Sequence, residues 1–463
     1  MANEVKNVNT LTTSSQIKNI NTLTDAQNKK ISTLEFTGTI DPSKISITND
    51  LVNSGRSWGA NVCYGSHLTD GTSQNQLFVT YGDVGNGGYV TVRVGTVSGD
   101  TITWGTEVEL DDQGASYHTE GIYNTREKRF MCHYHTTSGS NHHYAIGGTI
   151  TDKSVGDLGD AALVEGGSGY NQASQSNLAV YNTASDTMDC IYEYGDDAND
   201  GNHVRAVAFT DTTAADANDK NDLTVGSRQE FVNSPIEYMH IDYNKQRGNT
   251  VVVYHTADNT VKGRALVHSG TVAGGDDVAT RTSFTTMGAE AQLSTTANLQ
   301  ITDSYGGRGM CWDPDNNVHH NLLTWNQSSG WNATIVAASV GTSNDFTWSS
   351  DFTLVQGSGT SASGVTGGGI VYNHTRNRII TYGATSTAVG SQYNFEYHTY
   401  DGSNYASQGS ATTLSTLNGY FRGCGTTKED TSAIHTGSFM VNHVYDGTDD
   451  GDGCRIYCMD PGG

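Results

Sequence analysis

Residues 240–255 read HIDYNKQRGNTVVVYH, and this stretch decides the fold. An apolar segment ends in Tyr243, Asn244 follows, and a second β-rich segment begins after a polar turn. Four other stretches share this layout: GIYNTREKRFMCHYH from Gly121, LAVYNTASDTMDCIYEY from Leu178, GMCWDPDNNVHHNLLTW from Gly309 and GIVYNHTRNRIITY from Gly369. Their aromatic residues recur at intervals of 58, 62, 69 and 60 residues: Tyr123, Tyr181, Tyr243, Trp312 and Tyr372. The chain is therefore built of repeats about 60 residues long.

Each repeat is predicted to open with a β-hairpin. Asn or Asp follows the shared aromatic residue, and such short polar side chains bond the local backbone and tolerate a left-handed conformation. A second pair of strands follows, seen best in residues 90–110 and 334–355. Trp104 and Trp348 hold the same place in these segments, 244 residues apart, which is four periods of 61. The repeat therefore has four strands.

These repeats predict an all-β fold, a seven-bladed β-propeller of four-stranded blades with almost no helix, because residues 49–463 hold about seven repeats. The last repeat stops after a third strand. Residues 31–38, ISTLEFTG, resemble the closing strands of the other repeats. We expect them to pair with residues 454–459 and close the ring, so that no strand edge stays unpaired. The predicted division is an arm at 1–30 and a propeller at 31–463.

The composition excludes some classes of function. The 463 residues include 55 Gly and only 4 Pro, which is typical of a turn-rich β protein. The net charge is −24 at pH 7, so phosphate backbones and anionic lipid surfaces would repel the chain. We expect no nucleic-acid partner. The amino terminus has no basic segment followed by an apolar stretch, and no window is apolar enough to span a bilayer. We therefore expect no membrane insertion.

The seven cysteines are predicted to be reduced. An odd number in a chain of this length does not suggest a disulfide framework. Cys63, Cys311 and Cys424 occupy a position that holds Ile122, Val180, Asp242 and Val371 in the other repeats, and Cys132 matches Cys190. A position shared with aliphatic residues is a packing position, so we expect small buried thiols rather than nucleophiles or metal ligands.

Histidines and acidic loops raise the question of metal binding. His133 and His135 lie on one face of a predicted strand and His142 and His143 open the next, so three imidazoles could hold a metal. His255 follows Tyr254 just as His135 follows Tyr134, which favours packing between blades. Residues 446–453 and 196–201 resemble calcium loops but lack the acidic residue at loop position twelve, which favours solvated turns. No cofactor is predicted.

The innermost strand of each blade would line the central channel and carry any binding chemistry. The predicted binding residues at the channel mouth are Trp58, His118, His240, Arg308 and Arg422, and the same strands carry Glu120, Asn177 and Glu237. A sialidase-like enzyme needs several arginines around its substrate, and only Arg308 and Arg422, with Arg56, are available. We therefore expect no enzyme. The alternative is a glycan-active propeller enzyme, sialidase-like or lyase-like, that uses these channel residues.

Residues 95–110, GTVSGDTITWGTEVEL, and the hairpins hinged on Tyr-Asn resemble repeats in virion structural proteins of marine tailed bacteriophages, including tail-fibre and head-fibre proteins. The Asn/Thr-rich amino terminus is similar to the anchoring segments of such proteins. The resemblance implies a virion component, made in the host cytoplasm and attached to the capsid or tail, with its propeller outward. The chain lacks a long fibrous shaft, which favours a compact appendage over a full-length fibre.

The arm at residues 1–30 contains NVNTLT and NINTLT, from Asn7 and Asn19. Its sizeable apolar residues are too few to bury against one another, so we expect the arm to order only on a partner. These predicted partner-binding residues are Val8, Leu11, Ile17, Ile20 and Leu23. The expected partners are other virion proteins, a second copy of the chain, and host-surface glycans that contact aromatic and polar residues on the rim.

Overall fold

In the computed structural model the chain divides into two units, Met1–Ile40 and Asp41–Gly463. The second unit contains all of the residues that the structure describes. These are residues 46–51, 57–65, 76–98, 101–112, 116–124, 126–127, 129–136, 142–165, 178–194, 203–211, 222–232, 236–256, 260–293, 299–301, 309–327, 330–354, 368–373, 377–384, 392–407, 412–416, 419–425, 438–444 and 454–460.

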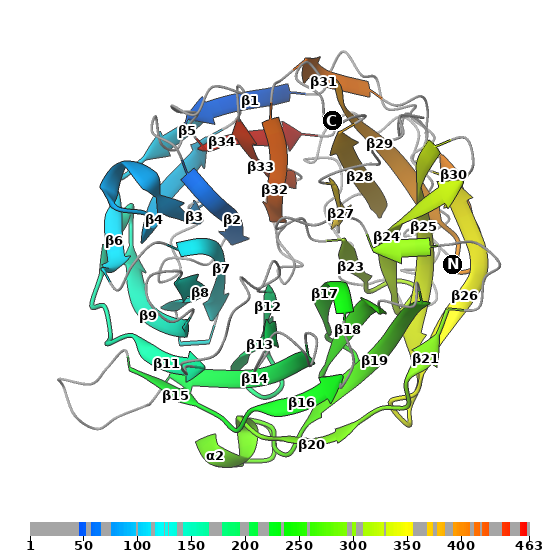
Figure 1. The fold of residues 1–463 in the computed structure, drawn as a ribbon, viewed down its shortest axis with the longest axis horizontal. Coiled ribbons are helices and arrows are strands. Elements are labelled where there is room, and N and C mark those ends of the chain that lie inside the picture. Colours follow the sequence, from blue (N-terminus) through cyan, green and yellow to red (C-terminus); the bar gives the residue numbers. More distant parts are fainter. Residues whose placement is uncertain are drawn as a thin grey trace, which may run out of the picture. The chain divides into compact units, whose positions relative to one another are not determined.

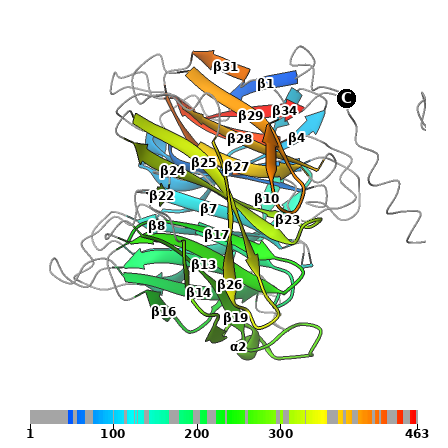
Figure 2. The same cartoon turned by 90° about the vertical axis from the view of Figure 1, so that its right-hand side faces the viewer.

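The described strands form seven antiparallel sheets, numbered here in chain order (Figures 1 and 2). Sheet 1 contains β2 (Ser57–Gly65), β3 (Gln76–Asp83), β4 (Tyr89–Ser98), β5 (Thr101–Trp104) and β6 (Val108–Asp111). Sheet 2 contains β7 (Ser116–Asn124), β8 (Arg129–Thr136), β9 (His143–Thr151), β10 (Ser154–Gly156) and β11 (Ala162–Glu165). Sheet 3 contains β12 (Leu178–Asn182), β13 (Thr187–Tyr194), β14 (His203–Asp211), β15 (Leu223–Val225) and β16 (Gln229–Val232).

The remaining four sheets follow the same order along the chain. Sheet 4 contains β17 (Ile236–Asn244), β18 (Asn249–Thr256), β19 (Thr260–His268), β20 (Phe284–Met287) and β21 (Ala291–Gln292). Sheet 5 contains β22 (Leu299–Ile301), β23 (Met310–Asp313), β24 (Val318–Gln327), β25 (Gly330–Val340) and β26 (Phe346–Leu354). Sheet 6 contains β27 (Gly368–Asn373), β28 (Arg378–Ala384), β29 (Gln392–Tyr400), β30 (Tyr405–Ser407) and β31 (Thr412–Thr416). Sheet 7 contains β32 (Gly419–Gly425), β33 (Ser438–Val444), β34 (Cys454–Asp460) and β1 (Ser46–Leu51).

The sheets are arranged radially, with one inner strand of each sheet nearest the centre (Figure 1). The inner strands contact one another in chain order: β2 with β7, β7 with β12, β12 with β17, β17 with β23, β23 with β27, β27 with β32, and β32 with β2. Radially arranged antiparallel sheets of this kind are a β-propeller. The prediction of an all-β propeller is confirmed.

Each sheet has four strand positions, as predicted, but one position in sheets 1 to 6 is divided into two short strands. In sheet 1, for example, β5 and β6 both pair with β4. Gly105 lies between them, and a Cβ atom at this position would come within 2.0 Å of the backbone oxygen of Lys153 in sheet 2. Gly226 and Gly288 divide the outer strands of sheets 3 and 4 in the same way. Close backbone contact with the next sheet therefore interrupts these strands and requires glycine there.

The hydrophobic core lies between neighbouring sheets. Between sheets 1 and 2, for example, the Phe78 and Phe130 rings are 5.9 Å apart and belong to one buried cluster. Cys132, Cys190 and Cys311 are buried and belong to no disulfide bond, which confirms the prediction for these three thiols. The side chains of Cys63, Cys424, Cys454 and Cys458 lie outside the described part of the structure.

The hairpin prediction is confirmed in atomic detail. Asn124 Oδ1 accepts hydrogen bonds from the backbone N–H groups of Arg126 and Glu127, each at 3.0 Å. Asn182, Asn244 and Asp313 cap the turns of sheets 3, 4 and 5 similarly. The fourth residue after the cap has a left-handed conformation in sheets 3 to 6: Asp186, Gly248, Asn317 and Asn377. The short polar residue after each aromatic therefore sets the turn.

The predicted ring-closing strand is wrong. The last strand, β34, pairs with β33 on one edge and with β1 (Ser46–Leu51) on the other, so residues 31–38 have no free edge of β34 to join. A ladder needs only an extended backbone in register, so the resemblance of 31–38 to the closing strands could not identify the partner. Residues 31–38 themselves lie outside the described residues.

Helix is scarce, as predicted. The described residues contain one short α-helix, α2 (Val278–Arg281), and one 3₁₀ turn, η3 (Val84–Asn86). Among them no helix is long and apolar enough to span a membrane. The predicted match between Trp104 and Trp348 is also confirmed, because both lie on strands that pair with the third strand of their sheet.

Candidate functional site

Most of the predicted binding residues have no described side chain. Trp58, His118 and Arg422 lie on the inner strands β2, β7 and β32, but the structure describes only their backbone. Arg308, the arm residues 1–30 and the acidic loops 196–201 and 446–453 lie outside the described residues. The binding role of these residues stays a prediction.

His240 is the predicted binding residue whose side chain is described. It lies on β17, is 1% exposed, and fills the space beside Gly309, where a Cβ atom would come within 1.9 Å of its ring. Within the described structure neither ring nitrogen has a hydrogen-bond partner. Burial lowers the pKa of His240 to about 3, so the ring is neutral. His240 therefore packs against the neighbouring sheet rather than facing solvent.

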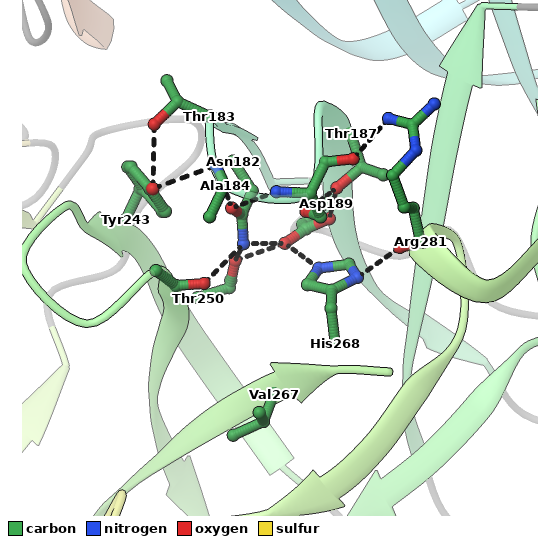
Figure 3. Close-up of polar contacts among 12 residues, drawn as sticks. Asn182, Thr183, Ala184, Thr187, Asp189, Tyr243, Thr250, Val267, His268 and Arg281 are labelled. Atoms are coloured by element: carbon green, nitrogen blue, oxygen red, sulfur yellow. Dashed lines mark hydrogen bonds and ion pairs between the residues drawn. The ribbon is translucent and has the colours of Figure 1, made fainter. Parts of the chain in front are cut away.

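The most extensively connected polar group lies between sheets 3 and 4 and centres on Asp189 of β13 (Figure 3). The Asp189 carboxylate accepts hydrogen bonds from Thr187 Oγ1 at 2.7 Å and from Thr250 Oγ1. Asn182 Nδ2 lies 3.3 Å and His268 Nε2 2.8 Å from one of its oxygens. Asp189 is 1% exposed, and its charge is balanced entirely by buried groups.

His268 carries the compensating charge. Its Nε2 faces Asp189, and its Nδ1 lies 2.6 Å from the backbone carbonyl oxygen of Arg281, so both ring nitrogens face acceptors. Only the imidazolium can donate at both positions. Burial lowers the pKa of His268, but the Asp189 carboxylate and the Arg281 carbonyl outweigh it, and the pKa is raised. Asp189 and His268 form a buried ion pair.

Asp186 extends this network into sheet 2. Arg281 at the end of α2 donates to its carboxylate at 3.2 Å and to the Ser185 carbonyl at 2.6 Å. Tyr181 donates to the same carboxylate at 2.8 Å, and Asn124 of sheet 2 donates at 3.1 Å. Buried polar contacts thus connect sheets 2, 3 and 4 around one hairpin turn.

This network is unsuited to catalysis. A histidine base needs one ring nitrogen facing a nucleophile, whereas both nitrogens of His268 are occupied by acceptors. The hydroxyls of Thr187 and Thr250 donate directly to Asp189 and not to the imidazole. Burial of Asp189 and His268 also keeps substrate away. Within the described structure, the network holds sheets together.

In the sequence, the network is marked by a charged residue at a strand position where other repeats have an apolar residue. Asp189 lies opposite Val180, at the place where sheet 2 has Met131 and sheet 4 has Val251. Its partner His268 ends β19 and precedes the long connection that carries α2. The repeat alignment could have identified Asp189, but not its partner 79 positions away.

The predicted histidine cluster forms between sheets 2 and 3. The ring of His143 lies 5.5 Å from His133, 4.9 Å from His135 and 4.7 Å from Tyr192. Burial lowers the pKa of His133 to about 3 and that of His135 to about 4, with help from neighbouring histidines. The described residues contain no group of three or more His, Cys, Asp or Glu placed to hold a metal. These rings pack as aromatic surfaces.

A third recurring feature is a tyrosine hydroxyl bonded to a carboxylate near the rim. Tyr192 donates to Glu165 at 3.1 Å, and Glu165 also pairs with Arg205 at 2.7 Å and Arg228 at 3.2 Å. Tyr134 with Asp111 and Tyr254 with Glu290 repeat the tyrosine contact. Burial comes first among the causes that raise the pKa of all three tyrosines, so their hydroxyls stay protonated and donate.

No protein-family model and no curated protein matches the chain. Among solved structures, a crystal structure of S. cerevisiae core factor is 11% identical with a TM-score of 0.50, covering 89% of this chain and 60% of its own. An ulvan lyase, a polysaccharide lyase, is 11% identical with a TM-score of 0.48, and the match covers 89% of this chain and 97% of the lyase. The fucose-specific lectin from Aleuria aurantia is 10% identical with a TM-score of 0.37, covering 82% and 100%. At these identities the similarity to core factor concerns the fold alone.

Proposed function

We propose that the seven sheets are the blades of one closed seven-bladed β-propeller. The cyclic order of contacts between inner strands, ending with β32 against β2, supports the closed ring. The pairing of β1 with β34 supports it as well, because it joins strands from both ends of the described chain in one blade. Such closure removes exposed sheet edges and stiffens the whole domain.

The protein is, in this proposal, a structural component of a bacteriophage virion, an appendage attached to the capsid or tail that contacts host-surface glycans. The sequence resemblance of residues 95–110 and of the hairpins suggests the virion. The observation that carries the structural role is the buried network around Asp189, which ties neighbouring blades with charged hydrogen bonds. A rigid, repetitive domain suits an exposed particle surface.

The charged network also bears on the enzymatic alternative. Asp189 and His268 form an acid–base pair that is buried, and both ring nitrogens of His268 already face hydrogen-bond acceptors. An appendage needs no open acid–base pair, whereas a lyase or glycosidase does. We therefore propose a binding and structural role rather than catalysis.

Co-purification with phage particles tests this function. Particles made from a genome that encodes the chain are banded on a density gradient, and the bands are analysed by mass spectrometry and by immunogold microscopy with antibodies to residues 41–463. The chain should band with particles, and the antibodies should label them. A chain found only in the soluble fraction of the lysate would overturn the virion role, and glycan cleavage by the purified protein would favour the enzyme.

A further inference from the structure

One cross-strand row in sheet 2 differs from the matching rows of its neighbours. In sheets 1 to 4 the row starts at a tyrosine on the second strand and crosses the third strand to the outer strand. Sheet 2 has Tyr134, Tyr144 and Leu163 in this row. The others have polar residues after the tyrosine: Tyr81, Thr91 and Glu109 in sheet 1, Tyr192, Arg205 and Glu230 in sheet 3, and Tyr254, Lys262 and Gln292 in sheet 4.

The row in sheet 2 is apolar and reaches the surface. Leu163 is 49% exposed, and Tyr144 is partly exposed. The Tyr144 ring stacks on the buried Tyr134 ring, with centroids 5.7 Å apart and planes at 22°. Tyr134 therefore holds the outer ring in place, and burying Leu163 would be favourable for any ligand that covers it.

Two polar side chains, Asp111 and His142, lie beside these tyrosine rings. Asp111 of sheet 1 accepts a hydrogen bond from Tyr134, and His142 Nδ1 lies 3.0 Å from the Tyr144 hydroxyl. Asp111 and His142 are both partly exposed, so each retains capacity to bond a ligand. Burial and the Asp111 carboxylate raise the pKa of Tyr144, so its hydroxyl stays protonated at neutral pH.

We propose that Asp111, His142, Tyr144 and Leu163 form a sugar-binding subsite between sheets 1 and 2, and that its ligand is an uncharged saccharide. An aromatic ring beside an aliphatic side chain matches the C–H face of a pyranose, and a carboxylate with an imidazole matches neighbouring hydroxyls. The Asp111 charge and the net charge of −24 disfavour sialylated or uronic-acid glycans. This inference rests on the glycan contact in the proposed function.

A protein partner fits this patch less well. Among the described residues, Leu158 and Leu163 are the exposed large hydrophobic side chains. A stable protein interface covers about 800 Å² on each partner, much of it apolar at its centre. Tyr144 and Leu163, which are cross-strand neighbours, provide an apolar surface on the scale of a sugar ring.

Exchange of the row for that of sheet 1 tests the subsite. The double variant Tyr144→Thr/Leu163→Glu reproduces the Thr91 and Glu109 pair that this fold already accommodates. Lys262→Thr, at the same register position in sheet 4, is the matched control. All three proteins, as full chains, are applied to an array of neutral, sialylated and uronic-acid oligosaccharides, and their melting temperatures verify folding.

The wild type and Lys262→Thr should bind the same neutral glycans, and the double variant should lose at least about tenfold in affinity. Asp111→Asn, which can still accept from Tyr134, should also weaken binding. Unchanged binding by a folded double variant would overturn the subsite while leaving glycan adhesion intact. No binding by the wild type would overturn both the subsite and the adhesion role. Binding only to anionic glycans would overturn the neutral-saccharide subsite and leave the adhesion role intact. Loss of particle incorporation with unchanged glycan binding would assign the patch to a protein partner.

Discussion

The Nε2 atom of His268 on β19 lies 2.8 Å from a carboxylate oxygen of Asp189 on β13, and this contact joins sheets 3 and 4 through a buried ion pair. Both side chains are at most 2% exposed. The pair links two segments that are 79 positions apart in the chain. Breaking this buried pair should therefore lower the free energy of unfolding more than breaking an ion pair on the surface.

Removal of one partner should be costly. Asp189→Asn leaves a buried imidazolium without its counter-charge, so the free energy of unfolding should fall by about 3 to 5 kcal/mol. Lys262→Gln, which removes the partly exposed pair with Glu290, should cost at most about 1 kcal/mol. Urea unfolding of both variants measures this difference. Equal losses would show that the Asp189 contact is not a buried ion pair.

Acid should destabilise the protein through its neutral histidines. The pKa is lowered to about 3 in His133 and to about 4 in His135, against 6.5 in a model peptide. The unfolded chain therefore binds more protons as the pH falls below about 6.5, and the stability of the folded state decreases. His268 has a raised pKa, so its contribution is present below about 6.5 and is lost only as the pH rises through its folded value.

The variant His133→Ile tests whether neutral histidines make the folded state less stable as the pH falls. Ile191 holds the matching position in sheet 3, so the substitution suits the repeat. Between pH 6.5 and pH 5, about the range above carboxylate titration, the wild type should lose more unfolding free energy than His133→Ile. A variant with the wild-type pH dependence would contradict the lowered pKa of His133.

The divided outer strands depend on glycine. In Gly288→Ala the new Cβ atom would lie 2.0 Å from the Asn344 backbone oxygen, which cannot rotate away. The expected loss is about 1 to 3 kcal/mol, or more if the sheets separate. In the control, Gly156→Ala, the nearest atom is Thr149 Oγ1 at 3.7 Å, so little should change. Thermal unfolding compares the two, and an unaffected Gly288→Ala would refute the close contact between sheets 4 and 5.

In the proposed closed ring, β1 completes the last blade by pairing with β34. Removal of residues 1–40 leaves the pairing of β1 with β34 intact, so the melting temperature of the propeller should change little. Removal of residues 1–52 also deletes β1 and leaves the β34 edge unpaired, so the melting temperature should drop by several degrees. If both truncated proteins melt alike, β1 does not close the ring.

The repeat pattern predicted the elements that depend on local chemistry. Asn182 and Asp313 set their turns by bonding the next backbone N–H groups, and a sequence shows this directly. The closing strand was wrong because pairing of β1 with β34 depends on spatial proximity of chain ends and not on a side-chain signature. The division of the outer strands was missed because Gly105 matters only through the backbone of the next sheet.

The sites were less predictable than the fold. His240 has a polar side chain and was therefore predicted to bind a ligand, but its ring is buried against Gly309. The partnership of Asp189 with His268 depends on the path of the α2 connection, which the repeat does not encode. Leu163 was inconspicuous because an exposed leucine in a closing strand is identified only after its register with Tyr144 is known.

Competition for host adsorption tests the central claim most directly. Host cells are incubated with the purified full chain, and adsorption of particles from a genome that encodes it is then counted. The wild-type protein should reduce adsorption in a saturable manner, and folded Tyr144→Thr/Leu163→Glu should not. Adsorption that stays unchanged at saturating wild-type protein would contradict the account of this chain as a virion adhesion module.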